Sequence, residues 1–325
     1  MKKLLYIVIA ALIAFPALAA TSTKKNSSRK ITVEKPDFAL IERETQDPKS
    51  EFYFPKLIKI YNRNDTSMTR EQYRHLYLGY LFQEDYDPYR TSPYNNQSDS
   101  VLTIVRATKQ RLDEVSDSLA KLVKSNTISA HEAEKQKERL KTLYKRQLRE
   151  LATIVELSLK DNPFDLRQMS VLVHASQEMG NAMKAKIWEY RLENILGAIK
   201  STGSGEDMDN AFYVIYPMHE YNMIQLLGYE PTAVDFPAEG FDYISVRPEA
   251  DSKRRIAKPA EGFYFNVANL SKQYELKHPE EPDSSTPATT PDPDTGYDDI
   301  PADYDDLPAD DEPTTILSPD EIPAE

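Results

Sequence analysis

The apolar residues of this chain recur at steps of three and four over most of its length, which predicts α-helices. Two short helices are expected after Pro36 and after Ser50. Thr69-Arg70-Glu71-Gln72 has the pattern of a capping box, so a third helix should begin there. One face of this third helix carries Tyr73, Leu76, Tyr77, Tyr80 and Leu81. These patterns predict a mainly α fold.

Residues 99–160 have the most regular pattern. Val105, Leu112 and Leu119 repeat at seven residues, with charged residues at most other positions, which is typical of a coiled-coil seam. The seam breaks near Asn126, and a second capping box begins at Ser129. We therefore expect an antiparallel coiled helical hairpin, inserted in a larger helical domain. Its seam could pair within one chain or mediate self-association.

A further pair of helices is predicted at 164–179 and 182–199, joined through Gly180-Asn181. The spacing resembles one tetratricopeptide-like helix pair, present in a single copy, so an extended solenoid is not expected. Residues 208–227 predict another helix, interrupted or kinked near Pro217.

The period changes from helical to alternating after Gly228. Residues 241–246 and 262–267 are short, aromatic and β-branched, and they predict two strands of a small C-terminal antiparallel β-hairpin. A lone hairpin is marginal in water, so these strands should pack on the helices. The helical domain with its hairpin is expected to span residues 36–278.

Both ends of the chain differ from this domain. Residues 1–19 combine two lysines, an apolar run and a small-residue cleavage site, as a signal peptide does. Residues 20–35 are polar and predict a flexible linker. Residues 279–325 contain sixteen acids, no Lys or Arg, and a tandem YDDIPAD-YDDLPAD repeat, which predicts a disordered acidic, Pro-rich tail.

Charge and cysteine content narrow the possible functions. The formal net charge of −13 is carried by the tail, and the body is nearly neutral, so nucleic-acid binding is not expected. The absence of cysteine excludes disulfides, thiol catalysis and a lipoprotein anchor. No transmembrane segment is expected after signal cleavage. The expected location is therefore periplasmic or secreted.

The segment from Tyr73 to Tyr94 contains six of the chain's tyrosines and is the predicted binding site. Pro88 and Pro93 predict turns that fold its second half back onto the helix. A second group lies near His219, and the two histidines, His75 and His219, could meet in space. The candidate binding residues are Tyr73, His75, Tyr77, Tyr80, Tyr86, Tyr89, Arg90, Tyr94, His219, Glu220 and Tyr221.

No catalytic or metal-ligating set can be assigned. His219-Glu220 begins like a zinc-protease HExxH motif, but Met223 occupies the position of the second histidine. His131-Glu132 fails in the same way. We therefore expect no metal and no cofactor, and packed, hydrogen-bonded histidines are favoured over ligands.

Several segments resemble a known family. They include FYFPKLIKIYN, YRHLYLGYLF with DYDPYR, DNPFDLRQM, KAKIWEYRL, DNAFYVI, HEYN and GFYFNV. Together they resemble an uncharacterised family of secreted Bacteroidota proteins known as domain of unknown function 4919. The resemblance implies no established activity, cofactor or site residue. The longer helical segment between Tyr94 and Asn162 and the acidic tail depart from the family pattern.

The sequence favours an exported, non-catalytic binding or interaction protein whose ligand is an unknown protein, peptide or glycan. The alternative is a hydrolase of cell-surface glycan or peptide that uses carboxylates with His75 or His219. A third interpretation is a structural adaptor built on the helical hairpin and the tail. A closed aromatic core would favour binding, whereas carboxylates converging in a pocket would favour the enzyme.

Overall fold

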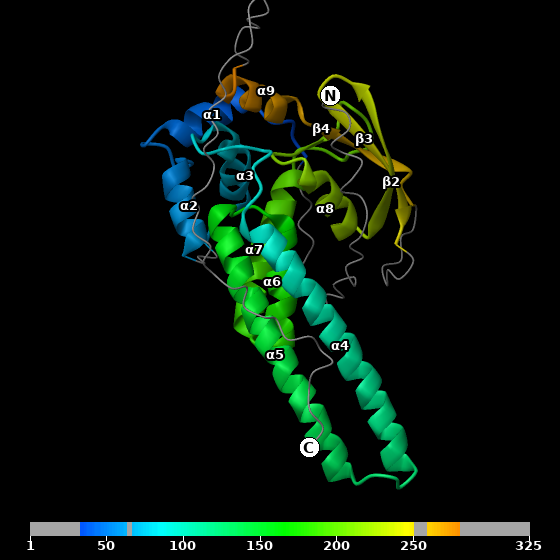
Figure 1. The fold of residues 1–325 in the computed structure, drawn as a ribbon. Helices are drawn as coiled ribbons and strands as arrows, with labels where there is room; N and C mark the ends of the chain where they lie inside the picture. Colours follow the sequence, from blue (N-terminus) through cyan, green and yellow to red (C-terminus); the bar gives the residue numbers. More distant parts are fainter. Residues whose placement is uncertain (1–32, 64–66, 250–258, 280–325) are drawn as a thin grey trace, which may run out of the picture. The chain divides into compact units, whose positions relative to one another are not determined.

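The computed structural model describes residues 33–63, 67–249 and 259–279, and it is mainly helical with a small four-stranded sheet (Figure 1). The predicted signal peptide, most of the predicted linker 20–35 and the predicted tail beyond Pro279 lie outside the described residues. The account below concerns the compact unit that ends at Pro279.

Side-chain caps or a proline mark the starts of the first three helices. Asp37 accepts a hydrogen bond from the Leu40 amide before α1 (Phe38–Gln46), and Pro55 lies in the first turn of α2 (Phe54–Asn62). The capping box predicted at Thr69 is present before α3 (Arg70–Gly79), which continues into the short 3₁₀ turn η2 (Tyr80–Phe82).

Helix α3 is the centre of the fold. Every residue from Tyr73 to Leu81 is buried, although the sequence pattern predicted a single apolar face. Helices α1, α2 and α7 pack around it. Even Arg74 is buried, where its guanidinium donates to the carbonyls of Ser201 and Glu34 at 2.9 and 2.6 Å.

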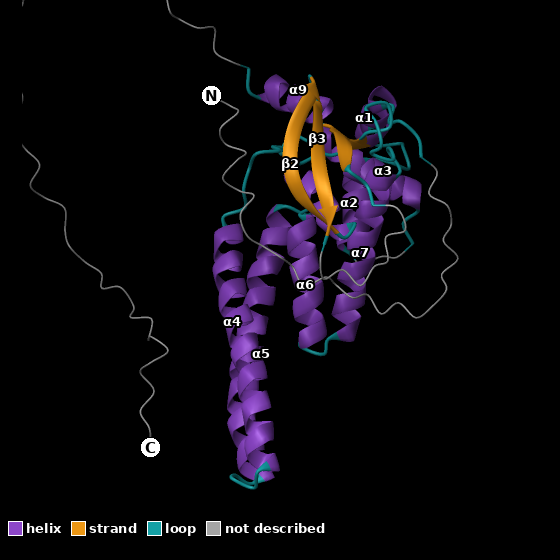
Figure 2. Cartoon of the chain, turned by 90° about the vertical axis from the view of Figure 1, so that its right-hand side faces the viewer, coloured by secondary structure: helices purple, strands orange, loops and turns teal. Residues whose placement is uncertain are grey.

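Helices α4 (Tyr94–Lys124) and α5 (Ala130–Asp161) lie side by side and extend beyond their neighbours (Figures 1 and 2). Leu112 and Leu119 of the predicted seam are buried against α5, which is capped by Ser129. Helix α4 begins five residues before the predicted start at 99, because Pro93 sets the backbone angle before its first turn.

Two further helices connect α5 to the centre. Helix α6 (Leu166–Glu178) is capped by Asp165, and α7 (Ala182–Lys200) is capped by Asn181. Between them Gly180 has φ +76°, the left-handed conformation that ends many helices. Helix α5 packs on α6, α6 on α7, and α7 on α3.

The β region is larger than the predicted hairpin. The predicted strands form β3 (Phe241–Pro248) and β4 (Gly262–Asn266), which pair antiparallel. Two unpredicted strands flank them, β1 (Phe212–Tyr213) parallel to β4 and β2 (Tyr229–Ala238) antiparallel to β3, in the order β1-β4-β3-β2. The sequence did not predict β2 because it contains Pro231 and Pro237, and proline is rare in strands. Proline is tolerated at sheet edges, and β2 is an edge strand.

The prediction of a helix over 208–227, interrupted or kinked near Pro217, is correct only after Pro217. Residues 212–213 are strand, and α8 (Met218–Leu226), which follows Pro217, is helical. Proline disfavours helical angles in the residue before it, so the helix starts at this point and does not bend through it. Helix α8 lies between the sheet and the other helices, and Figure 2 faces the opposite side of the sheet. A final helix, α9 (Ala268–Lys277), was not predicted.

We expect Gly79→Ala to lower the free energy of unfolding by about 1–3 kcal/mol, because a Cβ at this position would lie 2.5 Å from Thr45 Cγ2, where α1 meets α3. Gly197→Ala is the matched control, since no atom lies within 4 Å of its added Cβ and alanine favours the helix. Urea unfolding measures both changes. Equal effects at the two glycines would contradict close packing of α1 on α3, and Thr45→Ala should restore part of the lost stability.

Candidate functional site

The centre of the predicted site is a buried hydrogen-bond chain between Tyr77 and His219. The Tyr77 hydroxyl lies 2.7 Å from His219 Nδ1, and His219 Nε2 lies 2.9 Å from the Phe164 carbonyl oxygen. A carbonyl only accepts, so Nε2 carries the proton and Nδ1 accepts from Tyr77. Tyr77 in turn accepts from the Ile215 amide at 3.2 Å.

Both ring nitrogens of His219 are engaged in this chain of hydrogen bonds. Burial lowers the pKa of His219 to about 3, so the ring is neutral at physiological pH. Burial likewise raises the pKa of the Tyr77 hydroxyl far above its ordinary range. His219 is thus packed and hydrogen-bonded, as the sequence analysis favoured. Both nitrogens of His219 and the Tyr77 hydroxyl already have partners within the core, so neither side chain is positioned to bind a substrate.

The loop after η2 folds back as predicted at Tyr86. The Tyr86 hydroxyl donates to the Ile215 carbonyl at 2.6 Å, and its ring stands edge-on to Tyr80 at 5.6 Å between ring centroids. Lys277 of α9 donates to the carbonyls of Gln83 and Tyr86, which ties the loop to that helix. Tyr80 is also buried, and burial raises its pKa to about 12.

Tyr73 and His75 lie on other sides of α3. Tyr73 is 2% exposed and packs edge-on against Tyr61 and Tyr190. His75 stacks on Phe52 at 3.9 Å, with Nε2 2.9 Å from a Glu44 carboxylate oxygen. His75 and His219 therefore have no hydrogen-bond partner in common, and the structure does not join them in one site.

Only two of the predicted site residues are strongly exposed, Tyr89 and Arg90. Tyr89 is 46% exposed and stands edge-on to Tyr274 of α9 at 4.7 Å, so it packs on that helix and not on α3 as predicted. Arg90 donates to Asp161 at 2.5 Å. Tyr94 is half-buried as the first residue of α4 and is not part of the loop.

The aromatic group continues along α9. Tyr274 stacks on His278, one helical turn further on, at 4.4 Å between ring centroids. We call Tyr89, Tyr274 and His278 the aromatic rim. Sequence reasoning missed its second and third members because α9 was not predicted; the Tyr274–His278 spacing of four residues was the available signal.

Glu220 and Asp242 form a carboxyl pair that the sequence did not reveal. Glu220 of α8 is 2% exposed, and its carboxyl group lies close to that of the half-buried Asp242 on β3. Glu220 Oε1 is buried without a hydrogen-bond partner among the described residues. Two adjacent carboxyls in a desolvated site share a proton, and burial raises the pKa of Asp242 to about 6 and that of Glu220 well above its ordinary value.

Tyr221, the last predicted site residue, is half-buried beside this pair. Within residues 33–63, 67–249 and 259–279, no three acidic or histidine side chains are placed to hold a metal ion. In the same ranges, no helix is long and apolar enough to cross a membrane.

Comparison with known families shows to which family the chain belongs. The family described as domain of unknown function (DUF4919) matches residues 39–131 and 124–276. The chain belongs to this family. No curated protein and no solved structure matches it. The two matched ranges of this DUF4919 member include the Tyr77–His219 chain, and they overlap at residues 124–131, between α4 and the start of α5.

In this DUF4919 chain, Tyr77→Phe should lower the free energy of unfolding by about 2–3 kcal/mol, because it leaves His219 Nδ1 and the Ile215 amide unpaired in the core. Tyr89→Phe is the control, because that ring is half exposed and its hydroxyl should contribute less than about 0.5 kcal/mol. Equilibrium unfolding in denaturant measures both. A Tyr77→Phe protein as stable as wild type would show that the hydroxyl does not hold these groups.

Glu220→Gln should stabilise the domain increasingly as pH rises. The folded-state pKa values of Glu220 and Asp242 lie above their unfolded values, so stability falls as pH rises from about 4 through 6 and beyond. Glutamine removes one charge and donates to Asp242, which should raise stability by about 1–2 kcal/mol near pH 8. The measurement is thermal melting across pH, with exposed Glu150→Gln as control. A Glu220→Gln effect independent of pH would contradict the shared proton.

Proposed function

We propose that this chain is an exported, non-catalytic binding protein that contacts a peptide or glycan through the aromatic rim. The observation that carries the proposal is the division of the tyrosine cluster. Tyr73, Tyr77, Tyr80 and Tyr86 close the core, whereas Tyr89 presents a half-exposed ring beside Tyr274. The predicted tyrosine site is thus proposed to act at its surface, with the buried tyrosines as its support.

The rim is held rigid by what lies behind it. Tyr86, three residues before Tyr89, is fixed by its bond to the Ile215 carbonyl. Lys277, between Tyr274 and His278 on α9, is bonded to the loop carbonyls. A ligand would therefore meet rings that lose little conformational freedom on binding, which favours affinity.

The ligand class follows from the exposed chemistry. Tyrosine and histidine rings offer flat apolar faces with a polar group at one end, a combination suited to sugar rings and to apolar or aromatic peptide side chains. Arg90, which follows Tyr89 in the sequence, is half exposed and offers further donors besides its bond to Asp161. The proposal therefore names neutral or weakly anionic peptides and glycans.

The proposal also includes export of the protein and a partner-binding role for its two helix pairs. The signal-like residues 1–19 and the family resemblance support export. We interpret α6 and α7 as one tetratricopeptide-like pair, supported by their caps and by Gly180, and α4 with α5 as a coiled helical hairpin. Both are arrangements that proteins use to bind partners.

Tyr89→Ala should weaken binding of the exported protein to its ligands on glycan and peptide arrays by about tenfold or more, because it removes a central exposed ring. The protein should be recovered from the exported fraction, with a mass that shows loss of the first 19 or 20 residues. Tyr243→Ala is the matched tyrosine control, because Tyr243 on β3 precedes the buried Ile244 and so lies on the opposite face of the sheet. Binding that survives Tyr89→Ala but not Tyr243→Ala would place the site on the sheet instead.

The hydrolase alternative is favoured by one observation, the Glu220–Asp242 pair, whose Glu220 follows His219 in the sequence. Paired carboxyls that share a proton occur in acid-catalysed hydrolysis. Burial of Glu220 and the two hydrogen bonds of His219 weigh against access to a substrate. Hydrolysis of a glycan or peptide that is abolished by Glu220→Gln would support this alternative over the binding function.

A further inference from the structure

The loop that carries Tyr89 also carries three carboxylates. Glu84 and Asp85 are exposed, and Asp87 is half-buried. Asp87 accepts from the Tyr89 amide at 2.9 Å, so this acid is held beside the residue that bears the exposed ring. Asp85 accepts one long hydrogen bond, from the Tyr80 hydroxyl at 3.5 Å. In the part of the chain that the structure describes, the Glu84 carboxylate has no partner. We call Glu84, Asp85 and Asp87 the acidic loop.

Lys277 lies close to the acidic loop but does not satisfy its carboxylates. The Lys277 ammonium donates to the backbone carbonyls of Gln83 and Tyr86, and it lies 3.5 Å from that of Glu84. An ammonium group has three protons, so these carbonyls occupy them. Burial lowers the pKa of Lys277, and the nearby carboxylates of the acidic loop oppose this shift. The acidic loop thus surrounds a cation that is already bonded, and its oxygen atoms remain acceptors for a ligand.

Tyr89 offers a flat apolar face beside these acceptors. Its ring is 46% exposed and stands at 87° to the ring of Tyr274, so Tyr274 can cover at most one of its two faces. Tyr274 has a covered face of its own, because its ring stacks on His278. Tyr89 is therefore the open ring of the aromatic rim, and it combines an apolar surface with neighbouring carboxylate acceptors.

This combination fits a sugar better than an apolar peptide side chain. A pyranose ring has an apolar face of C–H groups and an edge of hydroxyl donors, so it can stack on Tyr89 while its hydroxyls donate to carboxylates. An apolar side chain binds strongly where it fills a desolvated pocket, whereas Tyr89 is an exposed ring on a loop. Such a side chain would also desolvate the acidic loop without giving it a hydrogen bond, which is costly.

The charge of this surface selects among glycans. The acidic loop contributes three carboxylates, whereas Lys277 and Arg90 contribute two cations, and Arg90 is already paired with Asp161. A sulfated or carboxylated sugar would therefore meet net repulsion, and a neutral sugar would not.

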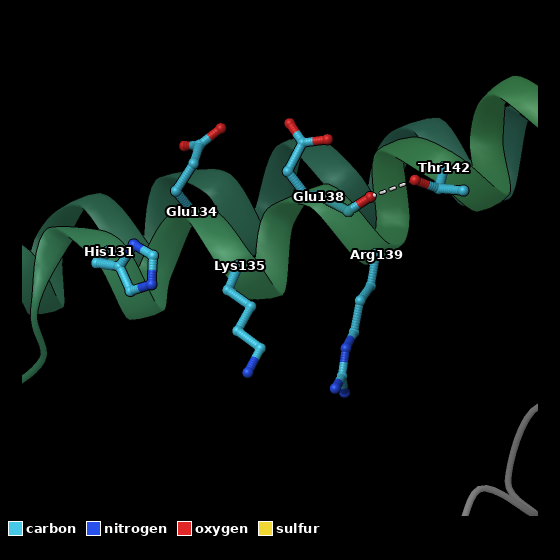
Figure 3. A pocket seen from close by; sticks show the side chains of 6 residues that line it. All are labelled: His131, Glu134, Lys135, Glu138, Arg139 and Thr142. Atoms are coloured by element: carbon cyan, nitrogen blue, oxygen red, sulfur yellow. Dashed lines mark hydrogen bonds between the residues drawn. The ribbon is translucent and has the colours of Figure 1, made fainter.

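A depression on α5 carries acids of a different kind. Figure 3 shows Glu134 and Glu138 on one edge of the helix, with Lys135 and Arg139 pointing the other way. Both glutamates already accept from Lys141, at 2.8 and 2.6 Å. The depression is lined by His131, Glu134, Lys135, Glu138, Arg139 and Thr142, all on one helix and with no tyrosine among them. Its two glutamates therefore serve as a matched control for the acidic loop.

We propose that the aromatic rim and the acidic loop together bind a neutral, hydroxyl-rich glycan. One pyranose unit stacks on Tyr89, and its hydroxyl groups donate to Glu84 and Asp85, while Asp87 holds the ring-bearing residue in place. This inference rests on the proposed function, because it uses the same rim. It narrows the ligand from two classes to one and adds two carboxylates to the site.

The test measures binding of the full chain to surfaces that bear neutral oligomers of glucose, galactose or mannose, sulfated forms of the same oligomers, or short uncharged peptides with aromatic side chains. Wild type should bind at least one of the neutral glycans. Tyr89→Ala should weaken this binding about tenfold or more. The double variant Glu84→Gln, Asp85→Asn should weaken it about fivefold, because amides accept hydrogen bonds less strongly than carboxylates.

The matched control is the double variant Glu134→Gln, Glu138→Gln, which makes the same change in net charge on α5. It should bind like wild type, and a loss equal to that of the acidic-loop variant would overturn the proposal. The acidic-loop variant should also bind the sulfated oligomers better than wild type does, because repulsion is reduced. Wild type that binds neutral and sulfated forms equally would contradict the role of the carboxylates.

The remaining outcomes separate this inference from the proposed function. Peptide binding that depends on Tyr89, without binding of any of the glycans, would overturn the glycan assignment and leave the rim as a binding site. Glycan binding that survives both Tyr89→Ala and the acidic-loop variant would overturn the inference and the rim together. Wild type that binds none of the glycans would overturn the inference as well. Thermal melting of each variant checks that the fold is retained.

Discussion

The hydroxyl of Tyr77 is the contact on which the arrangement of this domain most depends. It joins α3 to His219 of α8 and to the Ile215 amide, while His219 reaches the Phe164 carbonyl ahead of α6. Segments more than a hundred residues apart in sequence thus meet at one oxygen atom. All of these groups are buried, so losing any one of the hydrogen bonds would leave a polar group in the core without a partner. The aromatic rim and the sheet take their positions from elements that this contact joins.

The sequence predicted the parts of the fold that local chemistry controls. The capping box at Thr69, the helix after Pro36 and the buried leucines 112 and 119 are all present, because the signals that predicted them act over a few residues. The strand β2 was missed, and an interruption and a kink were both left open at Pro217. Proline is compatible with a sheet edge, a helix start or a kink, and only the tertiary context selects one of them.

The candidate site was harder to predict than the fold. Tyrosine density pointed to the correct region, yet it could not separate the buried rings of Tyr77 and Tyr86 from the exposed ring of Tyr89. Glu220 and Asp242 are 22 positions apart, on a helix and a strand, and nothing in their local sequence indicates that their carboxyl groups meet. Pairing of this kind depends on how α8 packs against the sheet, which no periodicity encodes.

Arg74 anchors the beginning of the domain to its central helix. Its buried guanidinium holds the Glu34 carbonyl, and the Glu34 amide donates to Ser201 at the end of α7. Glu34 is therefore bonded directly to the central helix and to the end of α7, and not to a peripheral loop. A pulling force applied at residue 34 would act on α3 and α7 at the same time, so the helices would not unfold one after another from this end.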